Sequence, residues 1–462
     1  MLSTPIWSAS RHARRMWASD VACGQSWTPT LTFFGSGTPP RYSRSRYGLA
    51  VRDLGRLDDA WLRAKPGRKW RQHAAASPPD APHGHLAAWV ADMDHPPADE
   101  ILDALRAVID GGDLGYPTWS TGEGGSPAAD AWVAWVARRH GWAPPRAEVR
   151  EWSDIVQAIQ TVLHLCTRPG DRVAVHVPAY PPFFAAIRAT GCELLPLPAH
   201  LGSDARWAWD HEALDEALAR TPARVLLLCN PHNPTGRCMT RGELAALLDV
   251  AERHDLLVVS DEIHAELVHD PHRHVPFASL PGAAARTVTL ASASKAFNLA
   301  GLRYAVSHVG PAWVRERLAT MPDHLLGEPN VMGAAAARAA WTAGEPWLAA
   351  MRAHLRTMRD LGCELVAERL PGVQVATPEA TYLLWLECRG ARGVDGAPLG
   401  DDPSTAFARR GVAVNPGPDF GPGGEGCVRL NVATTADVLR RVVDAMASAL
   451  SAPGAATSST SR

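Results

Sequence analysis

The segment RTVTLASASKAFNLAGLR, residues 286–303, decides how the rest of the sequence is interpreted. It opens with a short β-branched run typical of a buried strand, and it continues through two serines to Lys295. Active sites of open parallel sheets lie at the carboxyl ends of strands, where a partly desolvated lysine has a lowered pKa. Such a lysine acts as a nucleophile and proton carrier. Taken alone, the alternative is an ordinary surface lysine.

Lysine is scarce in this chain, and its scarcity draws attention to the same residue. Of 46 Lys and Arg residues in the 462-residue sequence, only Lys65, Lys69 and Lys295 are lysines. The first two lie in an arginine-rich stretch that we expect at the surface. Lys295 lies outside it, which favours a chemical role.

Composition bounds the class of protein. With 46% hydrophobic and 20% charged residues the chain can form a large core, which excludes disorder of the whole chain. The formal net charge of −2 gives no overall electrostatic attraction for nucleic acid or an anionic membrane. No apolar run reaches the roughly 18 residues that a membrane span needs. Eight cysteines without a C-x-x-C pair are expected to be buried thiols. We expect a soluble, cytoplasmic enzyme.

The two ends of the chain differ from its middle. Residues 1–45 are rich in Ser, Thr, Pro and Arg without apolar periodicity, and residues 451–462 are of low complexity. No continuous apolar segment of a signal peptide occurs in the first 30 residues. We expect a disordered extension at each end, with an organellar transit peptide as the alternative for residues 1–45.

The pattern between residues 96 and 325 predicts a large α/β domain. Amphipathic stretches alternate with short apolar runs, which are RVAVHVP, RVLLLCN, DLLVVSDE, RTVTLAS and RYAVSHV. Apolar strands separated by helices indicate a mostly parallel sheet covered by helices on both faces.

Residues 326–450 predict a smaller α+β domain. A long helical stretch is followed by the strand-like segments TYLLWLEC, GVAVNP and GCVRLNVA, and then by a last helix. Residues 46–95 are too few to form a core alone, so we expect them to join this second domain.

Two further strand ends carry polar groups. The turn CNPHNPTGR, residues 229–237, follows the apolar run RVLLL and holds its asparagines at fixed positions. DLLVVSDEIH, residues 255–264, ends its apolar run at Asp261. A carboxylate there is costly unless it meets a cation, although a helix N-cap is the alternative.

The order of these three motifs resembles the fold-type-I pyridoxal phosphate (PLP) enzymes of the aminotransferase class I/II superfamily, over about residues 65 to 450. The resemblance implies PLP as cofactor, with Lys295 attached to it and moving the Cα proton. It implies that Asp261 keeps the pyridine nitrogen protonated and that Asn233 hydrogen-bonds the phenolic oxygen. His264 stands where the superfamily often has Tyr facing the same oxygen, with a helix-start residue as the alternative.

The resemblance also implies contacts to the ring face and the phosphate. Tyr180 matches the aromatic residue that stacks on the ring. Ser292 and Arg303 match the serine and arginine that hold the phosphate. Ile155 and Val156 open a helix where the family has its phosphate-binding turn, although the residues just before them depart from the family pattern.

Three segments resemble a narrower branch, the MalY/PatB-type cystathionine β-lyases. They are WVADMD at 89–94, the Gly-Tyr-Pro run at 115–117, and GEPWL at 344–348. In that branch the counterpart of Tyr116 reaches the phosphate of the neighbouring subunit, which implies a homodimer with shared active sites. Arg429 matches the arginine that pairs with the α-carboxylate of an amino-acid substrate.

The resemblance implies a PLP-dependent carbon–sulfur β-lyase. It would cleave L-cystathionine or related L-cysteine S-conjugates to a thiol, pyruvate and ammonia. An aminotransferase acting on an L-amino acid and a 2-oxo acid is the alternative, and a binding protein without turnover is a third hypothesis. HDPHRH, residues 269–274, lacks the spacing and partner ligands of common zinc sites, so we expect no metal.

Overall fold

The computed structural model describes residues 54, 56–121, 126–322 and 326–451. The expected disordered segments 1–45 and 451–462 lie outside these residues, except for Ser451. The strands are β1 Leu86–Ala87, β2 Val149–Trp152, β3 Arg172–Val177, β4 Glu193–Pro198, β5 His200–Leu201, β6 Trp207–Ala208, β7 Val225–Cys229, β8 Leu257–Asp261, β9 Thr287–Ala291, β10 Ala305–Val309, β11 Gln374–Val375, β12 Leu383–Glu387, β13 Val412–Ala413, β14 Asn415–Pro416 and β15 Cys427–Asn431.

Helices connect and cover these strands. They are α2 Asp59–Ala64, α3 Arg68–Arg71, α4 Asp99–Gly111, α5 Pro127–His140, α6 Ile155–Cys166, α7 Pro181–Ala189, α8 His211–Arg220, α9 Arg241–Arg253, α10 Ala312–Ala319, α12 Val331–Ala343, α13 Glu345–Arg369, α14 Ser404–Ala408 and α15 Ala436–Ala447. None of the described helices is both long and apolar enough to cross a bilayer.

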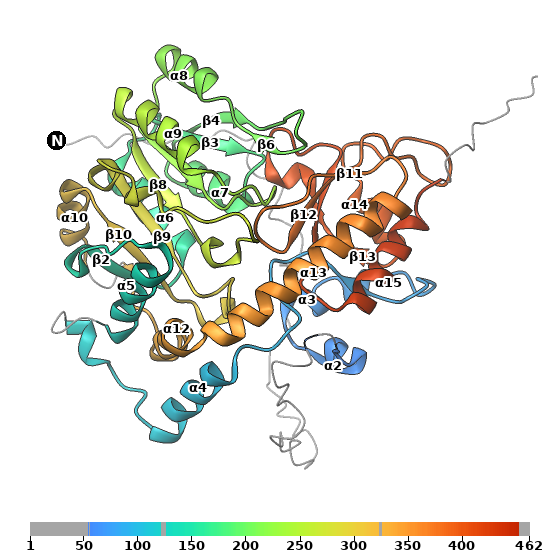
Figure 1. Cartoon of the computed structure of the whole chain (residues 1–462), viewed down its shortest axis with the longest axis horizontal. Helices are drawn as coiled ribbons and strands as arrows, with labels where there is room; N and C mark the ends of the chain where they lie inside the picture. Colours follow the sequence, from blue (N-terminus) through green and yellow to red (C-terminus); the bar gives the residue numbers. More distant parts are fainter. Residues whose placement is uncertain (1–53, 55, 122–125, 323–325, 452–462) are drawn as a thin grey trace, which may run out of the picture. The chain divides into compact units, whose positions relative to one another are not determined.

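A seven-stranded sheet in the order β2-β10-β9-β8-β7-β3-β4 carries the motifs (Figure 1). The pairings from β9 through β8, β7 and β3 to β4 are parallel, whereas β10 is antiparallel to both β9 and β2. Residues 292–304 join β9 to β10 without the α-helical crossover that a parallel return generally uses. The prediction of a mostly parallel sheet is confirmed.

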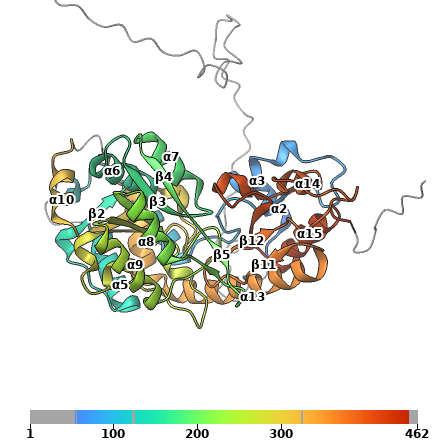
Figure 2. The same ribbon diagram turned by 90° about the horizontal axis from the view of Figure 1, so that it is seen from above.

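Helices cover both faces of this sheet, as predicted. Val225 and Leu227 of β7 pack in one core cluster with α6, α7 and α10, whereas Leu226 and Leu228 pack in another with α8 and α9. Figure 2 shows these two helix groups on opposite sides of the strands. Because side chains alternate along a strand, burial on both faces requires the unbroken apolar run seen in the sequence.

A second, antiparallel sheet in the order β11-β12-β15-β14 packs with α13 and α15. Near the N-terminus of the described chain, β1 pairs in parallel with β13. This pairing supports the assignment of residues 46–95 to the smaller α+β domain. The domain boundaries themselves stay a prediction.

Candidate active site

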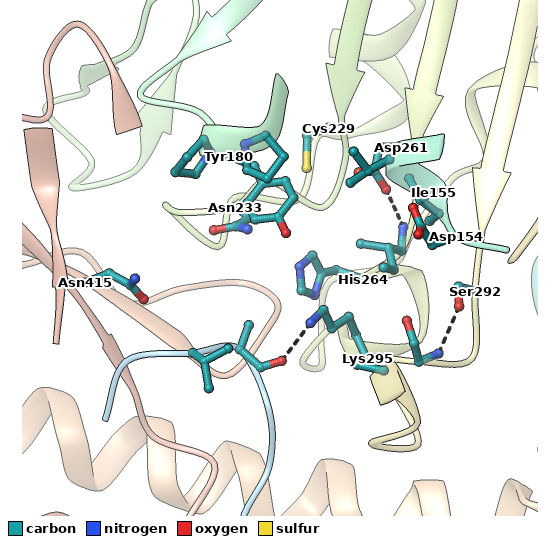
Figure 3. A pocket seen from close by; sticks show the side chains of 18 of the residues that line it. Asp154, Ile155, Tyr180, Cys229, Asn233, Asp261, His264, Ser292, Lys295 and Asn415 are labelled. Atoms are coloured by element: carbon teal, nitrogen blue, oxygen red, sulfur yellow. Dashed lines mark hydrogen bonds between the residues drawn. The ribbon is translucent and has the colours of Figure 1, made fainter. Parts of the chain in front are cut away.

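A cavity of about 320 Å³ opens beside the carboxyl ends of β7, β8 and β9 (Figure 3). It brings together every predicted site residue except Tyr116. Those lining it are Ile155, Val156, Tyr180, Asn233, Asp261, His264, Ser292, Lys295, Arg303 and Arg429. Side chains that are far apart in sequence therefore come together at the carboxyl ends of the strands, as expected for an open parallel sheet.

Lys295 lies at the centre of this group. Its Nζ donates a hydrogen bond to the carbonyl oxygen of Ala91 at 2.8 Å, and it lies 3.9 Å from Oδ1 of Asp92. Burial lowers the pKa of Lys295, and the nearby Asp92 carboxylate opposes this shift. A neutral amine is therefore more accessible here than on a surface lysine.

Asp261 ends β8 inside the protein. Its Oδ1 accepts a hydrogen bond from the amide of Ile263 at 3.1 Å, and it forms no ion pair with any described residue. Burial raises the pKa of Asp261 to about 7. A carboxylate held in this way is stabilised by a cationic ligand placed against it.

The N-P-T-G turn fixes Asn233. Gly236 has φ +71°, and a Cβ atom there would lie 2.2 Å from Cβ of Pro378. Its carbonyl oxygen accepts hydrogen bonds from the amides of Glu379 and Ala380, each at 2.9 Å. Glycine is therefore required both by the backbone conformation and by the close approach of the 378–380 loop.

Arg429 extends from β15 into the cavity. Its guanidinium donates to Oδ1 of Asn233 at 2.9 Å, Oδ1 of Asn415 at 2.6 Å and the carbonyl oxygen of Trp89 at 3.2 Å. Burial lowers its pKa to about 10, so it stays charged at neutral pH. Its buried Nε has no hydrogen-bond partner in the described part of the chain, which leaves a donor for an anionic ligand.

His264 and Tyr180 both line the cavity. Burial lowers the pKa of His264 to about 3, so its imidazole is neutral, and its Nδ1 has no partner among the described residues. Tyr180 precedes α7, and its ring lies 5.7 Å from that of Phe183. Figure 3 shows Tyr180, Asn233 and His264 around one space.

The remaining end of the cavity is suited to an anion. The N-terminus of α6, at Ile155 and Val156, lines this end, and Asp154 caps the helix by accepting from the amide of Gln157 at 2.8 Å. Arg303 pairs with the Asp154 carboxylate. Ser292 Oγ donates to the carbonyl oxygen of Tyr304 at 2.6 Å.

The family model described as aminotransferase class I and II matches residues 146–446. The chain belongs to this family. Among curated relatives, cystathionine beta-lyase PatB of Bacillus subtilis is 35% identical over 78% of this chain and 92% of its own length. Cystathionine beta-lyase of Corynebacterium glutamicum is 31% identical over 80% of this chain and 95% of its own length.

A solved structure shares the fold. The PLP-bound C-S lyase of Staphylococcus hominis superposes with a TM-score of 0.77, at 24% identity, over 86% of this chain and 98% of that one. At that identity the likeness shows the fold of this aminotransferase-family member and nothing finer.

The cofactor implied for this family fits the residues present. Asp261 is a buried carboxylate without a cation, His264 has an unpartnered ring nitrogen, and Lys295 supplies an amine. The α6 N-terminus adds amide donors for a phosphate. In chemistry, these groups match the pyridinium, phenolic oxygen, aldehyde and phosphate of pyridoxal phosphate.

The surface expectation is wrong for Lys69, whereas Lys65 is half-buried. Lys69 is buried, with its Nζ 3.1 Å from Oδ1 of Asp94, and Trp70 Nε1 donates to the same oxygen at 2.7 Å. Lys65 donates to the carbonyl oxygen of Asp94. All three lysines therefore contact residues 91–94. The backbone carbonyl oxygens and the Asp94 carboxylate of this segment need hydrogen-bond donors, and the lysine ammonium groups supply them.

Tyr116 lies elsewhere on the described chain. Its side chain is 97% exposed, and two exposed apolar residues, Ile109 and Leu114, lie nearby in sequence. It lines a separate hollow with Val331 and Arg338. Within one subunit, Tyr116 takes no part in the cavity around Lys295.

Sequence reasoning missed several groups that form the cavity wall. Asn415, which holds Arg429, is its cross-strand partner in the β14–β15 pairing, and only the register of that pairing identifies it. Ala91 contributes a carbonyl oxygen, which leaves no side-chain signal. Among the described residues, no cluster of three or more His, Cys, Asp or Glu is arranged to hold a metal ion.

Proposed function

We propose that this protein is a PLP-dependent carbon–sulfur β-lyase. It cleaves L-cystathionine or related L-cysteine S-conjugates to a thiol, pyruvate and ammonia. The observation that carries the proposal is the single cavity in which the amine of Lys295, the carboxylate of Asp261 and the guanidinium of Arg429 converge. The relatives named cystathionine beta-lyase support the choice of reaction.

When bound, pyridoxal phosphate supplies an electron sink for charge that develops at the substrate Cα. The residues that would hold it line one cavity. Asp261 would meet the ring nitrogen, Asn233 and His264 would meet the phenolic oxygen, and Tyr180 would cover one ring face. Ser292, Arg303 and the first amides of α6, at Ile155 and Val156, would meet the phosphate.

Arg429 orients the substrate. Its fixed guanidinium pairs with the α-carboxylate, and the contacts to Asn233 and Asn415 prevent it from swinging away. Orientation places the Cα–H bond toward the amine of Lys295. Burial lowers the pKa of Lys295, which favours the neutral amine that a general base requires.

Lys295 then moves the proton. Its Nζ takes the proton from Cα, the bond between Cβ and sulfur breaks, and the sulfur leaves with the bonding electron pair as a thiolate that is protonated to the thiol. The three-carbon fragment leaves as 2-aminoacrylate, which water converts to pyruvate and ammonia. No oxidant or reductant is consumed.

Steady-state assays with cystathionine and S-ethyl-L-cysteine test this proposal. We expect equal amounts of thiol and pyruvate, and we expect Lys295→Ala to lower kcat about 10²–10⁴-fold, the range of a lost general base. Circular dichroism checks that the variant is folded. If the folded wild type, supplied with PLP, releases neither product, the proposal is wrong.

An aminotransferase is the second candidate, because the matching family carries that description. It would use the same three side chains but return the proton to the cofactor rather than expel a thiolate. Stoichiometric formation of pyridoxamine phosphate from an amino acid, without pyruvate or thiol, would favour it.

We also propose a homodimer with shared active sites. The 97% exposed ring of Tyr116, with Leu114 61% and Ile109 60% exposed, forms an apolar surface suited to burial against a second copy. We place the protein in the cytoplasm. The seven described cysteines are free thiols, which suits a reducing compartment.

A further inference from the structure

A second cavity adjoins the one around Lys295. It has a volume of about 410 Å³ and lies between the α3 region and the β13–β14 segment. Arg68, Trp89 and Asn415 line both cavities, so they form the common wall. A substrate whose α-carboxylate meets Arg429 therefore has a neighbouring space of small-molecule size for whatever extends from its sulfur.

Two side chains of opposite charge, Arg68 and Asp419, line this second cavity, and both are solvent-exposed. The guanidinium of Arg68 lies 5.0 Å above the Trp89 ring and bonds only the neutral side chain of Gln72. Asp419 lines the same cavity. In the described part of the chain, neither residue forms an ion pair with the other or with any other side chain.

The other polar groups in the cavity are neutral. Burial lowers the pKa of His73, which favours its neutral form, and it lowers the pKa of His85 to about 4, so the His85 imidazole is neutral at pH 7. The buried Nε2 of His85 and the Oγ of Ser77 have no hydrogen-bond partner among the described residues. Unsatisfied buried polar atoms generally mark an unfilled hydrogen-bonding site.

We propose that the second cavity binds the distal amino-acid head of a cystathionine-type substrate, with Arg68 on its carboxylate and Asp419 on its ammonium group. One anionic and one cationic group in a cavity whose other lining residues are neutral match a zwitterion better than an alkyl group. The inference rests on the proposed lyase function, which it narrows from cysteine S-conjugates in general to those with a charged amino-acid substituent.

Substrate preference is the first test. We expect kcat/KM for L-cystathionine to exceed that for S-ethyl-L-cysteine in the wild type. Asp419→Asn and Arg68→Gln should each lower the ratio of these two values about tenfold, the effect of losing one charge-assisted contact. Asp401→Asn and Arg71→Gln are matched controls, because these exposed residues lie outside both cavities.

A charge-reversal variant is expected to change which substrate the enzyme prefers. Misfolding would lower activity toward both substrates and would not produce such a change. Asp419→Lys should shift the preference from cystathionine to S-(2-carboxyethyl)-L-cysteine, whose substituent ends in a carboxylate alone. We expect the ratio of kcat/KM for these two compounds to change about tenfold or more relative to the wild type.

Equilibrium binding separates this inference from the lyase proposal. 2,7-Diaminosuberate has the backbone length of cystathionine but no sulfur to expel, and 2-aminooctanoate lacks the distal head. By calorimetry on the holoenzyme, we expect the first to bind about tenfold more tightly, and Asp419→Asn to abolish the difference. Equal binding of both ligands, with unchanged substrate ratios in the variants, would overturn the inference even if S-ethyl-L-cysteine is cleaved.

Discussion

Burial sets the charge of the side chains around the cavity. It lowers the pKa of Lys295, raises that of Asp261 to about 7, and lowers that of His264 to about 3. Each shift opposes the charged form, because the surrounding protein solvates charge poorly. A bound cofactor with a cationic ring nitrogen and an anionic phosphate would compensate these costs, so stability and cofactor binding are coupled.

Asp261 makes this coupling measurable in cofactor-free protein. Between its ordinary pKa of 3.8 and its folded value of about 7, the folded chain retains a proton that the unfolded chain releases. The free energy of unfolding therefore falls as pH rises through this window, by up to about 1.4 kcal/mol per pH unit.

We expect Asp261→Asn to remove that contribution. Urea unfolding of wild type and variant at pH 4.5, 5.5, 6.5 and 7.5 gives a difference that grows with pH and then levels off. Asp401→Asn, at an exposed position, should leave the pH dependence unchanged. A difference independent of pH would contradict the assigned burial of this carboxylate.

Turns and short segments position these residues, and the Gly236 turn is closely packed against the 378–380 loop. We expect Gly236→Ala to destabilise the protein by about 3 kcal/mol or more, since left-handed strain adds to overlap with Pro378. Gly112→Ala is the matched control: φ is +69°, but nothing lies within 4 Å of the added Cβ, so about 1–2 kcal/mol is expected. If urea unfolding shows equal losses of stability for the two variants, the overlap with Pro378 does not contribute to the cost at Gly236.

The α3 segment is held by one buried carboxylate. Asp94 accepts from both Lys69 and Trp70, and its removal leaves the Lys69 ammonium buried without a counter-charge. We expect Asp94→Ala to cost about 3–5 kcal/mol in urea unfolding. Asp103→Ala, which breaks an exposed pair with Arg106, should cost at most about 1 kcal/mol. Comparable costs would show that Lys69 is solvated in solution.

At the scale of the whole molecule, the separation of Tyr116 from the cavity has a direct test. If Tyr116 acts across a homodimer, Lys295→Ala and Tyr116→Ala damage different subunits of a shared site. We expect each variant alone to have low lyase activity and a mixture, refolded or co-expressed, to regain part of it. Light scattering should give twice the 49.6 kDa chain mass. A mixture no more active than its components would contradict shared sites.

The sequence was informative where function depends on side chains in ordered motifs. Lys295, Asp261 and Asn233 each follow an apolar strand, and parallel pairing brings them to one edge. It was uninformative where a contact depends on backbone atoms or register. The carbonyl oxygen of Ala91 and the side chain of Asn415 belong to that second class.

The interpretation of Lys69 failed for a related reason. An arginine-rich neighbourhood indicates exposure on average, yet burial is decided by the partner, and Asp94 lies 25 residues further along the chain. Charged residues are seldom fully buried without a partner, so the burial of Lys69 depends on Asp94 and its local sequence does not predict it.

The convergence of all three lysines on residues 91–94 has a practical consequence. Apart from the terminal α-amine, every primary amine of this chain lies beside residues 91–94, which border the cavity around Lys295. In a protein with many surface lysines, acylating or reductively alkylating reagents modify many sites. In this chain they would modify only amines near the cavity around Lys295 and the terminal α-amine. Labelling stoichiometry would then report directly on whether that cavity is occupied.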